Sequence, residues 1–361
     1  MYIARKIETH LSGNLERDEI IVLVGGRQSG KTTLLRNINS ELEKQEEITF
    51  FFSLENIRYL QMLNEHPENL FKLIGNLPGK RVYVFIDEIQ YLDNPSNFLK
   101  YIYDEYKGRI KLIVTGSSAF FIDQKFKDSL AGRKRLLELK LLDFKEFLRF
   151  KNCEQMIEYF PQTPLLEKRE IPGLVKDKLD RLFMEFITYG AYPGVALEKN
   201  EKQKVLLLEE LLNSYLAKDV EILGIKKKEK FFHLLRILSM QPGNLVNLSE
   251  LANTLRISTT AVENYFYILE KSFQVRKILP FSSNLRKELT KMPKFYFLDL
   301  GIRNMLLDNF APMESRMDKG IIGENLVFKL LDDREDIRRL NFWRTQSKQE
   351  VDFIIDGKYA L

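Results

Sequence analysis

The segment GGRQSGKTT at residues 25–33 constrains the fold of this chain more than any other feature. It follows an apolar run, IIVLV at 20–24, and precedes a helical pattern at 31–44. Its glycines let the backbone turn so tightly that successive N–H groups point inward, and the helix adds the positive end of its dipole. A strand, a glycine loop and a helix in this order are typical of a phosphate-binding loop.

The G-x-x-x-x-G-K-T pattern in this loop predicts individual roles. Lys31 is expected to reach the β- and γ-phosphates of ATP, and the Thr32 hydroxyl to bind Mg²⁺. The other residues expected to line the nucleotide are Gly25, Gly26, Arg27, Gln28, Ser29, Gly30 and Thr33, with the side chains of Arg27 and Gln28 pointing away from the phosphates. The alternative is a glycine loop that only turns a strand into a helix.

Two adjacent acids, Asp87 and Glu88, follow the apolar run VYVFI. They are expected at the carboxyl end of a buried strand, where open parallel sheets bind ligands. A magnesium ion would compensate their charge, so we expect Asp87 to hold the metal and Glu88 to orient the attacking water. The alternative is a strand that ends in solvated acids.

Two further candidates rest on weaker patterns. Thr115, Ser117 and Ser118 end the run KLIVTGSS and are candidates for contact with the γ-phosphate or the attacking water, or for a simple helix cap. Arg133, in SLAGRKR, is a candidate arginine finger acting on a neighbouring subunit, with Arg135 as the alternate. The alternative for both arginines is solvated surface.

The first 150 residues alternate apolar runs with helical patterns. Strands are expected at 20–24, 48–53, 81–86, 111–115 and 136–142, and an amphipathic helix follows at 143–150. Strands that are apolar throughout and separated by helices predict a parallel sheet covered on both faces, so the fold class is α/β.

Composition excludes several classes of protein. The single cysteine, Cys153, rules out an internal disulfide, and three scattered histidines argue against zinc. No apolar run approaches the 18 or so residues of a membrane span, and the N-terminus lacks a signal-peptide core, so we expect a soluble, cytoplasmic protein.

Residues 221–294 carry 13 Lys and Arg against 6 Asp and Glu, a net charge of +7. This basic region is a possible footprint for nucleic acid.

The second half of the chain is expected to contain more than one domain. Residues 151–180 are proline-containing and charged and predict a connector, and residues 181–220 are helical apart from the turn YGAYPG at 189–194. Helices are then followed by two strand-like runs, QVRKILPF and KFYFLDL. We therefore expect an ATPase domain at 1–150, a helical connector or lid at 151–225, a winged-helix domain at 226–298 and a last domain at 299–361.

Residues 247–271 fit a helix-turn-helix. A first helix presents apolar residues at helical spacing, Ser258 is a good N-cap, and a second helix carries Thr259, Thr260, Glu263 and Asn264 on its polar side. That helix is a candidate for the major groove of DNA, with the basic segment 276–294 as a wing on the phosphates. The alternative is a winged helix that packs against protein or covers the nucleotide.

The runs GGRQSGKTTLL, VYVFIDEIQYL, KLIVTGSSA, SLAGRKR, TYGAYPGV, KFYFLDLGI, GENLVF and EVDFII together resemble a family of predicted AAA+ superfamily ATPases of bacteria and archaea, over nearly the whole chain. The resemblance implies an AAA-type ATPase domain, a winged-helix region and a segment similar to PD-(D/E)xK nucleases. It identifies Lys31 and Thr32 with the Walker A pair, Asp87 and Glu88 with the Walker B pair, residues 115–117 with the sensor position, and Arg133 with the arginine of S-L-x-G-R. The YGAYPG turn has no catalytic rationale and is interpreted as a structural turn that closes the ATPase half.

The nuclease-like segment departs from its pattern. Glu324, Glu350 and Asp352 resemble the first acids of such a site, where paired acids hold a metal. The sequence ends at Leu361, before a strand that bears E-x-K, so the lysine and one metal ligand are expected to be missing. We predict no nuclease activity for this chain.

Two functions from different classes remain open. The first is an enzyme that hydrolyses ATP with Mg²⁺ and couples this to rearrangement of its C-terminal domains, as a homo-oligomer if Arg133 acts in trans. The second is a switch that holds ATP with little turnover and sets the conformation of a DNA- or protein-binding half.

Overall fold

The computed structural model describes residues 2–77, 79–116, 130–160, 171–220, 224–282, 292–345, 347 and 349–361. The chain divides into two compact units, Met1–Lys140 and Leu141–Leu361, called unit 1 and unit 2 below. Across the described residues, no helix combines the length and the apolar character that crossing a membrane requires.

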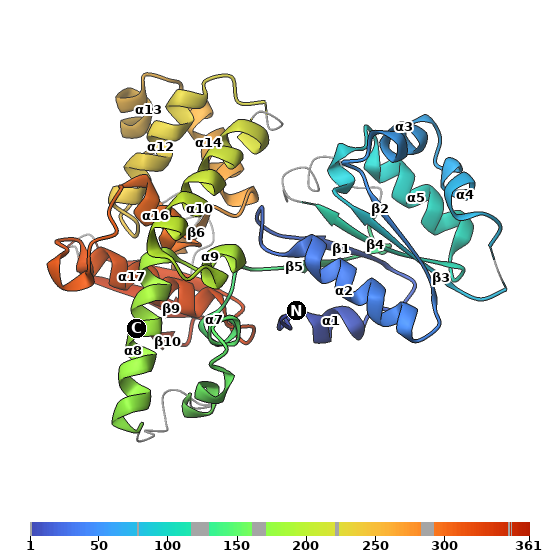
Figure 1. Ribbon diagram of the computed structural model, residues 1–361. Helices are drawn as coiled ribbons and strands as arrows, with labels where there is room; N and C mark the ends of the chain where they lie inside the picture. The colour runs from blue at the N-terminus through green and yellow to red at the C-terminus, as the bar shows by residue number, and fades with distance from the viewer. Residues whose placement is uncertain are drawn as a thin grey trace. The chain divides into compact units, whose positions relative to one another are not determined.

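Unit 1 is built on a parallel sheet with the strand order β2-β3-β4-β1-β5 (Figure 1). The strands are β1 (Ile20–Val24), β2 (Ile48–Ser53), β3 (Val82–Asp87), β4 (Ile110–Gly116) and β5 (Lys134–Glu138). Every residue of β1, β3 and β4 is buried, as expected for central strands covered on both faces. The predicted α/β parallel sheet is therefore confirmed.

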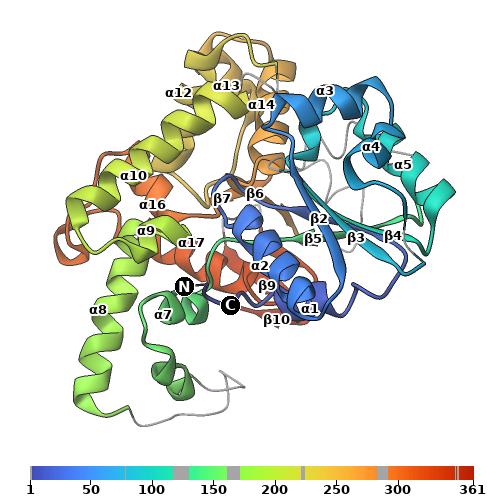
Figure 2. The same cartoon turned by 45° about the vertical axis from the view of Figure 1, so that its right-hand side comes forward.

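Helices cover both faces of this sheet (Figures 1 and 2). On one face, α1 (Glu8–Ser12) and α2 (Lys31–Lys44) share a core with β1, β3 and β4. On the other face lies α5 (Pro95–Tyr106), which packs on β4. Two shorter helices, α3 (Ile57–Glu65) and α4 (Asn69–Ile74), precede β3. The glycine loop at 25–30 thus joins the buried strand β1 to a helix that is anchored in the core.

The amino ends of the strands are held together by two cations. The fully buried Lys111 ammonium donates to the carbonyl oxygens of residues 14, 17 and 19, at 2.6 to 2.8 Å. The Arg81 guanidinium donates to the carbonyl oxygens of Glu16 and Arg17, both at 2.8 Å. Burial, with the charge of Arg81 as a smaller contribution, lowers the pKa of Lys111 to about 8. Unit 1 is therefore fastened at the end of the sheet opposite to the glycine loop.

The last strand of unit 1 differs from its prediction. We expected it at 136–142, but β5 begins at Lys134 because it pairs with the whole of β1, from Ile20↔Lys134 to Val24↔Glu138. Beyond Glu138 one more bond follows, from the Leu139 N–H to the Val24 carbonyl oxygen at 2.7 Å. Register with β1 therefore fixes this strand, and its own apolar pattern does not.

Unit 2 combines helices with a second five-stranded sheet of order β10-β9-β8-β6-β7 (Figure 1). Its regular elements in chain order are α7 (Phe144–Phe150), η2 (Glu154–Tyr159), α8 (Gly173–Tyr189), α9 (Pro193–Leu197), α10 (Glu201–Ser214), η3 (Tyr215–Asp219), α12 (Lys228–Met240), α13 (Leu248–Leu255), α14 (Thr259–Lys271), β6 (Val275–Pro280), β7 (Lys294–Phe297), α16 (Leu300–Leu306), η4 (Met313–Ser315), α17 (Lys319–Asp332), β8 (Leu340–Arg344), β9 (Glu350–Ile355) and β10 (Tyr359–Ala360). Pairing of β6 with β8 makes the β6–β7 hairpin and the C-terminal strands one sheet. The predicted boundaries at 225 and 298 stay predictions.

Two predictions for this half are wrong. Helix α8 begins at Gly173, inside the segment expected to be an irregular connector, because Pro172 immediately precedes a continuous helical pattern. The run KFYFLDL is a strand only to Phe297, since the Asp299 carboxylate accepts the Ile302 N–H at 2.8 Å and caps α16.

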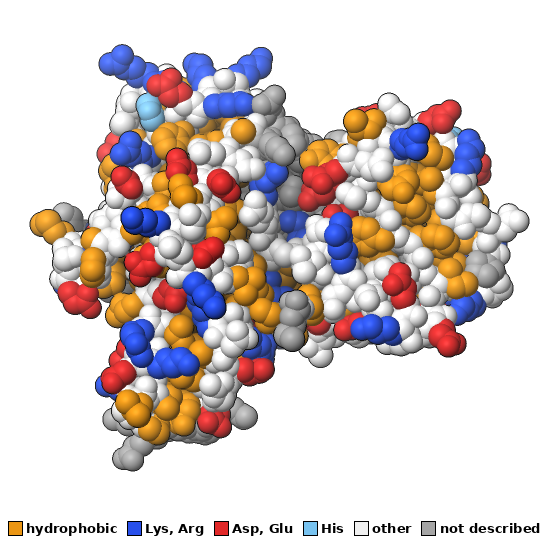
Figure 3. All heavy atoms as spheres, in the orientation of Figure 1, with side chains coloured by type: hydrophobic (Ala, Val, Ile, Leu, Met, Phe, Trp, Pro, Cys, Tyr) orange, Lys and Arg blue, Asp and Glu red, His pale blue; other side chains and the backbone are white. Residues whose placement is uncertain are grey.

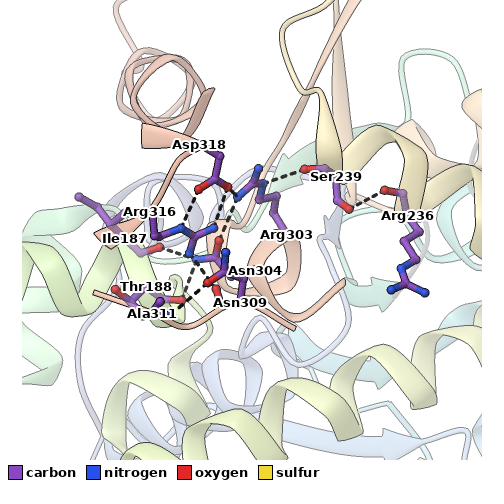
Figure 4. A network of polar contacts seen from close by, with 10 residues as sticks. All are labelled: Ile187, Thr188, Arg236, Ser239, Arg303, Asn304, Asn309, Ala311, Arg316 and Asp318. Atoms are coloured by element: carbon purple, nitrogen blue, oxygen red, sulfur yellow. Dashed lines mark hydrogen bonds and ion pairs between the residues drawn. The ribbon is translucent and has the colours of Figure 1, made fainter. Parts of the chain in front are cut away.

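A buried ion network joins three helices of unit 2 (Figure 4). The fully buried Arg303 of α16 donates through Nε to the Ser239 carbonyl oxygen of α12 at 2.8 Å, and through its terminal nitrogen to Asp318. Arg316 makes two bonds to the same Asp318 carboxylate, and these arginines hold the pKa of Asp318 well below its usual range. Asn304 donates to the Thr188 carbonyl oxygen of α8 at 2.9 Å. Polar contacts of long sequence separation therefore fix α8, α12 and α16.

The YGAYPG turn packs against the start of α16 in unit 2. The Ala191 carbonyl oxygen also accepts the N–H of Leu142, which lies within the segment expected as the ATPase domain, at 3.1 Å, and the interpretation of the turn as the close of that domain stays a prediction. The fully buried Asp299 carboxylate accepts the Ala191 N–H at 2.6 Å. Gly190 has a φ of 81°, and a Cβ placed on it would lie 2.4 Å from both Asp299 carboxylate oxygens. Burial raises the pKa of Asp299 to about 6, although its backbone hydrogen bonds act in the opposite direction. The turn thus requires glycine for both conformation and space.

We predict that Gly190→Ala destabilises unit 2 by more than about 2 kcal/mol, because the new methyl group would enter the Asp299 carboxylate at a positive φ. Gly194→Ala is the matched control, since Gly194 lies in α9, four residues further on, with no atom within 4 Å of its ideal Cβ position. The control is expected to be neutral or slightly stabilising. Chemical unfolding of both variants tests this, and equal stability would contradict it.

Candidate functional site

The glycine loop of unit 1 is shaped by backbone geometry that few residues other than glycine tolerate. Gly30 has a φ of 101°, and a Cβ on Gly25 would lie 2.4 Å from the Leu139 carbonyl oxygen. Gln28, at a φ of 55°, is exposed, whereas Ser29 is fully buried. The close approach of Gly25 to the segment after β5 leaves no room for a side chain at the base of the loop.

Lys31 begins α2 and turns back over the loop. Its ammonium donates to the carbonyl oxygens of Gly25 at 3.1 Å and Gly26 at 2.9 Å, and its side chain is only 4% exposed. A buried cation therefore sits within the curve of the loop, at the positive end of a 14-residue helix. Both features favour an anionic ligand at this point.

The Asp87 carboxylate joins the ends of two strands to the glycine loop. One oxygen accepts the Thr32 hydroxyl at 2.8 Å, and the other accepts the hydroxyl of Thr115. Asp87 ends β3, Thr115 lies near the end of β4, and Thr32 is the second residue of α2. These three side chains, expected near one ligand, are thus brought together at the carboxyl edge of the sheet.

Glu88 adopts a conformation that is uncommon for its residue type. Its φ of 61° and ψ of 49° are left-handed, and its N–H donates to the Thr115 hydroxyl at 3.0 Å. The Glu88 carboxylate accepts the side-chain amide of Gln90. Burial raises the pKa of Glu88 above its usual value, opposed by the charge of Lys31. Backbone strain and a raised carboxyl pKa are both features of functional sites.

The residues of this edge fit magnesium and a nucleotide triphosphate. A hydroxyl and a carboxylate that are already in contact, Thr32 and Asp87, are oxygen ligands of the kind that Mg²⁺ prefers. Glycine loops of this kind can offer backbone N–H groups to phosphates, and here the Lys31 cation lies on the loop. The fit rests on the kind of donors and on a loop that packs closely against Leu139 at its base and carries the Lys31 ammonium on its carbonyl oxygens.

The remaining predicted residues are exposed or partly exposed in and after the loop, or are not described. Thr33 and Gln28 are exposed and Arg27 is partly exposed. Ser117 and Ser118 lie outside the residues that the structure describes. Their roles, like those of the whole predicted set, stay predictions.

Arg133 lies at the amino edge of the sheet, far from the glycine loop of its own chain. Its carbonyl oxygen accepts the N–H of Ile20 at 2.8 Å, and the loop begins only after Val24. Four residue steps of a strand span about 13 Å. The Arg133 guanidinium forms a two-point ion pair with Asp104 of α5, at 2.7 and 3.2 Å. A role for Arg133 within the same chain is therefore excluded by distance.

Arg5 is a residue of this site that the sequence did not reveal. It is 6% exposed, and its guanidinium donates to the carbonyl oxygen of Ser29 in the loop at 2.9 Å. A second bond, at 2.7 Å, goes to the carbonyl oxygen of Lys140. These partners are 24 and 135 residues away, and no local pattern marks an arginine for such contacts.

A second polar cluster forms in unit 2 around Lys294. Its ammonium, 2% exposed, lies 3.2 Å from Glu324 and 3.3 Å from Asp352, and also contacts Glu350. The predicted acids of the nuclease-like segment therefore come together around a lysine that is not the E-x-K lysine expected to be missing, and the absence of that lysine stays a prediction. The lysine comes from β7, which precedes all three acids in the chain.

The Lys294 cluster is closely packed. Tyr296 donates to Glu324 at 2.6 Å, and a Cβ on Gly243 would lie 2.5 Å from a Glu324 oxygen. Burial alone would lower the pKa of Lys294, but the carboxylates of Glu350 and Glu324 outweigh it and raise the pKa. Among the described residues, no group of three or more acidic, histidine or cysteine side chains is arranged to hold a metal. The ammonium occupies the position between the carboxylates.

Comparison with known families divides the chain in a similar way. Residues 17–148 match a family model described as an AAA domain. Residues 180–312 match a domain of unknown function (DUF8612). The first match spans the glycine loop and all five strands of unit 1, and the second spans the helices α9 to α16.

Relatives resemble most of the chain. An uncharacterized protein of Methanocaldococcus jannaschii is 29% identical over 99% of this chain and 75% of its own length. An uncharacterized protein of Mycobacterium tuberculosis is 23% identical over 98% of this chain and 71% of its own length. Among solved structures, AMPPCP-bound DnaA from Aquifex aeolicus is 20% identical, with a TM-score of 0.32, over 74% of this chain and 89% of that one.

We predict that Lys294→Met lowers the free energy of unfolding of unit 2 by about 2 to 4 kcal/mol, because it leaves three carboxylates without their shared cation. The loss is smaller than for a fully buried ion pair because the Asp352 side chain is half exposed. Because the folded pKa of Lys294 is raised, its contribution is complete at neutral pH and is lost only as the pH rises through that value. Lys277→Met is the control, since Lys277 is exposed and pairs across from Phe295 on the same sheet. Equal unfolding midpoints for both variants would contradict the prediction.

Proposed function

We propose that this chain, a P-loop protein of the AAA type over residues 17–148, binds ATP with magnesium and hydrolyses it. The observation that carries the proposal is the hydrogen bond of 2.8 Å between the Thr32 hydroxyl and Asp87. It links the first residues of the helix after the glycine loop to the end of the buried strand β3, which is separated from β1 by β4. A loop for phosphates and an acid for their metal therefore converge on one point.

Each residue of this edge has a proposed role. Backbone N–H groups of the loop cradle the phosphates, and Lys31 exchanges its two carbonyl acceptors for phosphate oxygens. Thr32 and Asp87 hold the metal, which neutralises charge on the phosphates when it is bound. Thr115 orients both acids, since it donates to Asp87 and accepts the Glu88 N–H.

Glu88 is the proposed residue that positions and polarises the attacking water. The left-handed backbone conformation at Glu88 ends the extended course of β3, whereas Asp87 is the last residue of that strand and accepts hydrogen bonds from Thr32 and Thr115. Two adjacent acids thereby have different surroundings, as acids with different roles require.

Arg133 is proposed to act in trans. Since its own glycine loop is out of reach, only the loop of a second copy would come within range, after the arginine leaves Asp104. This part of the proposal implies a homo-oligomer.

We predict that Glu88→Gln binds nucleotide about as tightly as the wild type but hydrolyses ATP at least about 100-fold more slowly, because the water loses its base. Lys31→Ala is expected to lose nucleotide binding. A fluorescent nucleotide titration and a phosphate-release assay measure both. Equal turnover in the wild type and Glu88→Gln would reject the catalytic assignment.

The pH dependence of turnover gives a second readout of the same variant. Glu88 must be ionised to act, and burial raises its pKa, so activity in the wild type is expected to fall on acidification at a pH above 4.5, the usual value for glutamate. This acidic limb should be absent from the residual activity of Glu88→Gln.

The alternative is a switch that holds ATP with little turnover. The same loop and acids serve both kinds of protein, and the contact of Gln90 with the Glu88 carboxylate is the feature that favours it, because Glu88 is then engaged elsewhere. A single-turnover measurement separates them: hydrolysis of bound ATP over seconds to minutes supports the enzyme, and nucleotide that stays intact over hours supports the switch.

DNA binding by unit 2 is a second candidate function. In α14, Thr259, Thr260, Glu263 and Asn264 are exposed, while the opposite side is buried. Lys226, Lys227 and Lys228 are exposed at the start of α12, and the Tyr265 hydroxyl donates to the Lys227 carbonyl oxygen at 3.4 Å. Basic side chains gather at this end of the unit (Figure 3). Residues 283–291, in the middle of the proposed wing, lie outside the described residues.

We predict salt-dependent binding of duplex DNA. Neutralisation of about four phosphates gives a slope of about −3.6 in log affinity against log salt. Changing Lys226, Lys227 and Lys228 together to Gln should reduce this slope, whereas the same change at the exposed Lys176, Lys199 and Lys202 should not. Fluorescence anisotropy measures the slope. No binding at low salt would reject DNA as the partner and favour protein packing by this region.

A further inference from the structure

We propose that Arg5 is a positioning residue of the nucleotide site, which holds the glycine loop in its phosphate-binding shape. This rests on the proposed function. The Arg5 guanidinium bridges two backbone carbonyl groups that are distant in sequence, Ser29 in the loop and Lys140 after β5. An arginine fork suits this task because its donors are fixed in one plane.

The first side of this bridge is in the loop itself. The Ser29 carbonyl belongs to the peptide that leads into Gly30, whose φ of 101° is a left-handed conformation that glycine adopts without strain. The Arg5 guanidinium nitrogen lies 3.6 Å from the position of a Cβ on Gly30. Arg5 therefore fixes the orientation of the last peptide before the helix whose N-terminus faces the phosphates.

The second side of the bridge is in the segment that closes the base of the loop. Leu139 donates to Val24 and packs its carbonyl oxygen against Gly25, and the next carbonyl, of Lys140, accepts from Arg5. The two ends of the loop thus meet consecutive residues after β5: Gly25 lies close against Leu139, and Ser29 is joined to Lys140 through Arg5. Without Arg5, the Ser29 end of the loop loses this connection to the segment after β5.

Arg5 is itself held in place by Glu8. The Glu8 carboxylate accepts the Arg5 backbone N–H and the Tyr2 hydroxyl, the latter at 2.5 Å. The segment 2–8 is therefore anchored before the guanidinium reaches the loop. A buried arginine against Ser29 and Gly30, just before the start of α2, also adds positive charge, which favours an anion there.

The test compares Arg5→Gln with Arg81→Gln in the full chain. Arg81 is a matched control because it also donates to two backbone carbonyl oxygens, but at the opposite end of the sheet. We expect Arg5→Gln to raise the Kd of a fluorescent ADP about tenfold. The kcat at saturating ATP should stay within about threefold of the wild type, because the loop binds the ground state and the transition state alike. Arg5→Lys should recover part of the affinity. Arg81→Gln should lower the melting temperature and leave Kd unchanged.

The outcomes separate this inference from the proposed function. If the wild type binds no nucleotide, the proposed function fails. If the wild type binds nucleotide and Arg5→Gln binds it equally well, or if both arginine variants weaken binding to the same degree, Arg5 serves only the stability of the unit and the inference is overturned.

Discussion

The carboxylate of Asp87 is the interaction on which unit 1 depends. It is buried, and a buried carboxylate is costly unless hydrogen bonds or a cation compensate it. Two hydroxyls do so, from Thr32 after the glycine loop and from Thr115 on β4. These contacts require the strand order in which β4 lies between β3 and β1. The same strand order therefore stabilises the sheet and brings the polar side chains of its carboxyl edge together.

Local sequence patterns were sufficient to predict most elements of unit 1 and some helices of unit 2. The glycine loop, the buried strands and the acids after VYVFI are short-range features, because periodicity and glycine spacing act within a few residues. The helices α13 and α14 and the Ser258 N-cap follow from the same kind of pattern. The position of β5 could not be predicted from its own sequence pattern, because pairing with β1 determines where this strand begins.

The features missed by the sequence are contacts between distant residues. Arg5 lies 135 residues from Lys140, and Lys294 reaches acids at 324, 350 and 352. An arginine or lysine in a charged segment looks like solvated surface until the fold surrounds it. Asp299 was missed for the same reason, because the turn at Gly190 and the strand end at Phe297 carry no sign that they meet.

The two units use buried charge in different ways. In unit 1 the cations Lys31 and Arg5 donate to backbone carbonyl oxygens, and a phosphate group can take the place of those that accept from Lys31. In unit 2 the cations Arg303 and Lys294 are paired with carboxylates, which fixes the helices and the second sheet. Exchangeable partners suit a binding site, and fixed ion pairs suit a scaffold.

The most direct measurement is a crystal structure of the chain with Mg²⁺ and a non-hydrolysable ATP analogue. The account predicts that the Lys31 ammonium leaves the carbonyl oxygens of Gly25 and Gly26 for the phosphates, and that the metal lies between Thr32 and Asp87. A nucleotide bound elsewhere, with the Thr32 to Asp87 hydrogen bond intact, would contradict it.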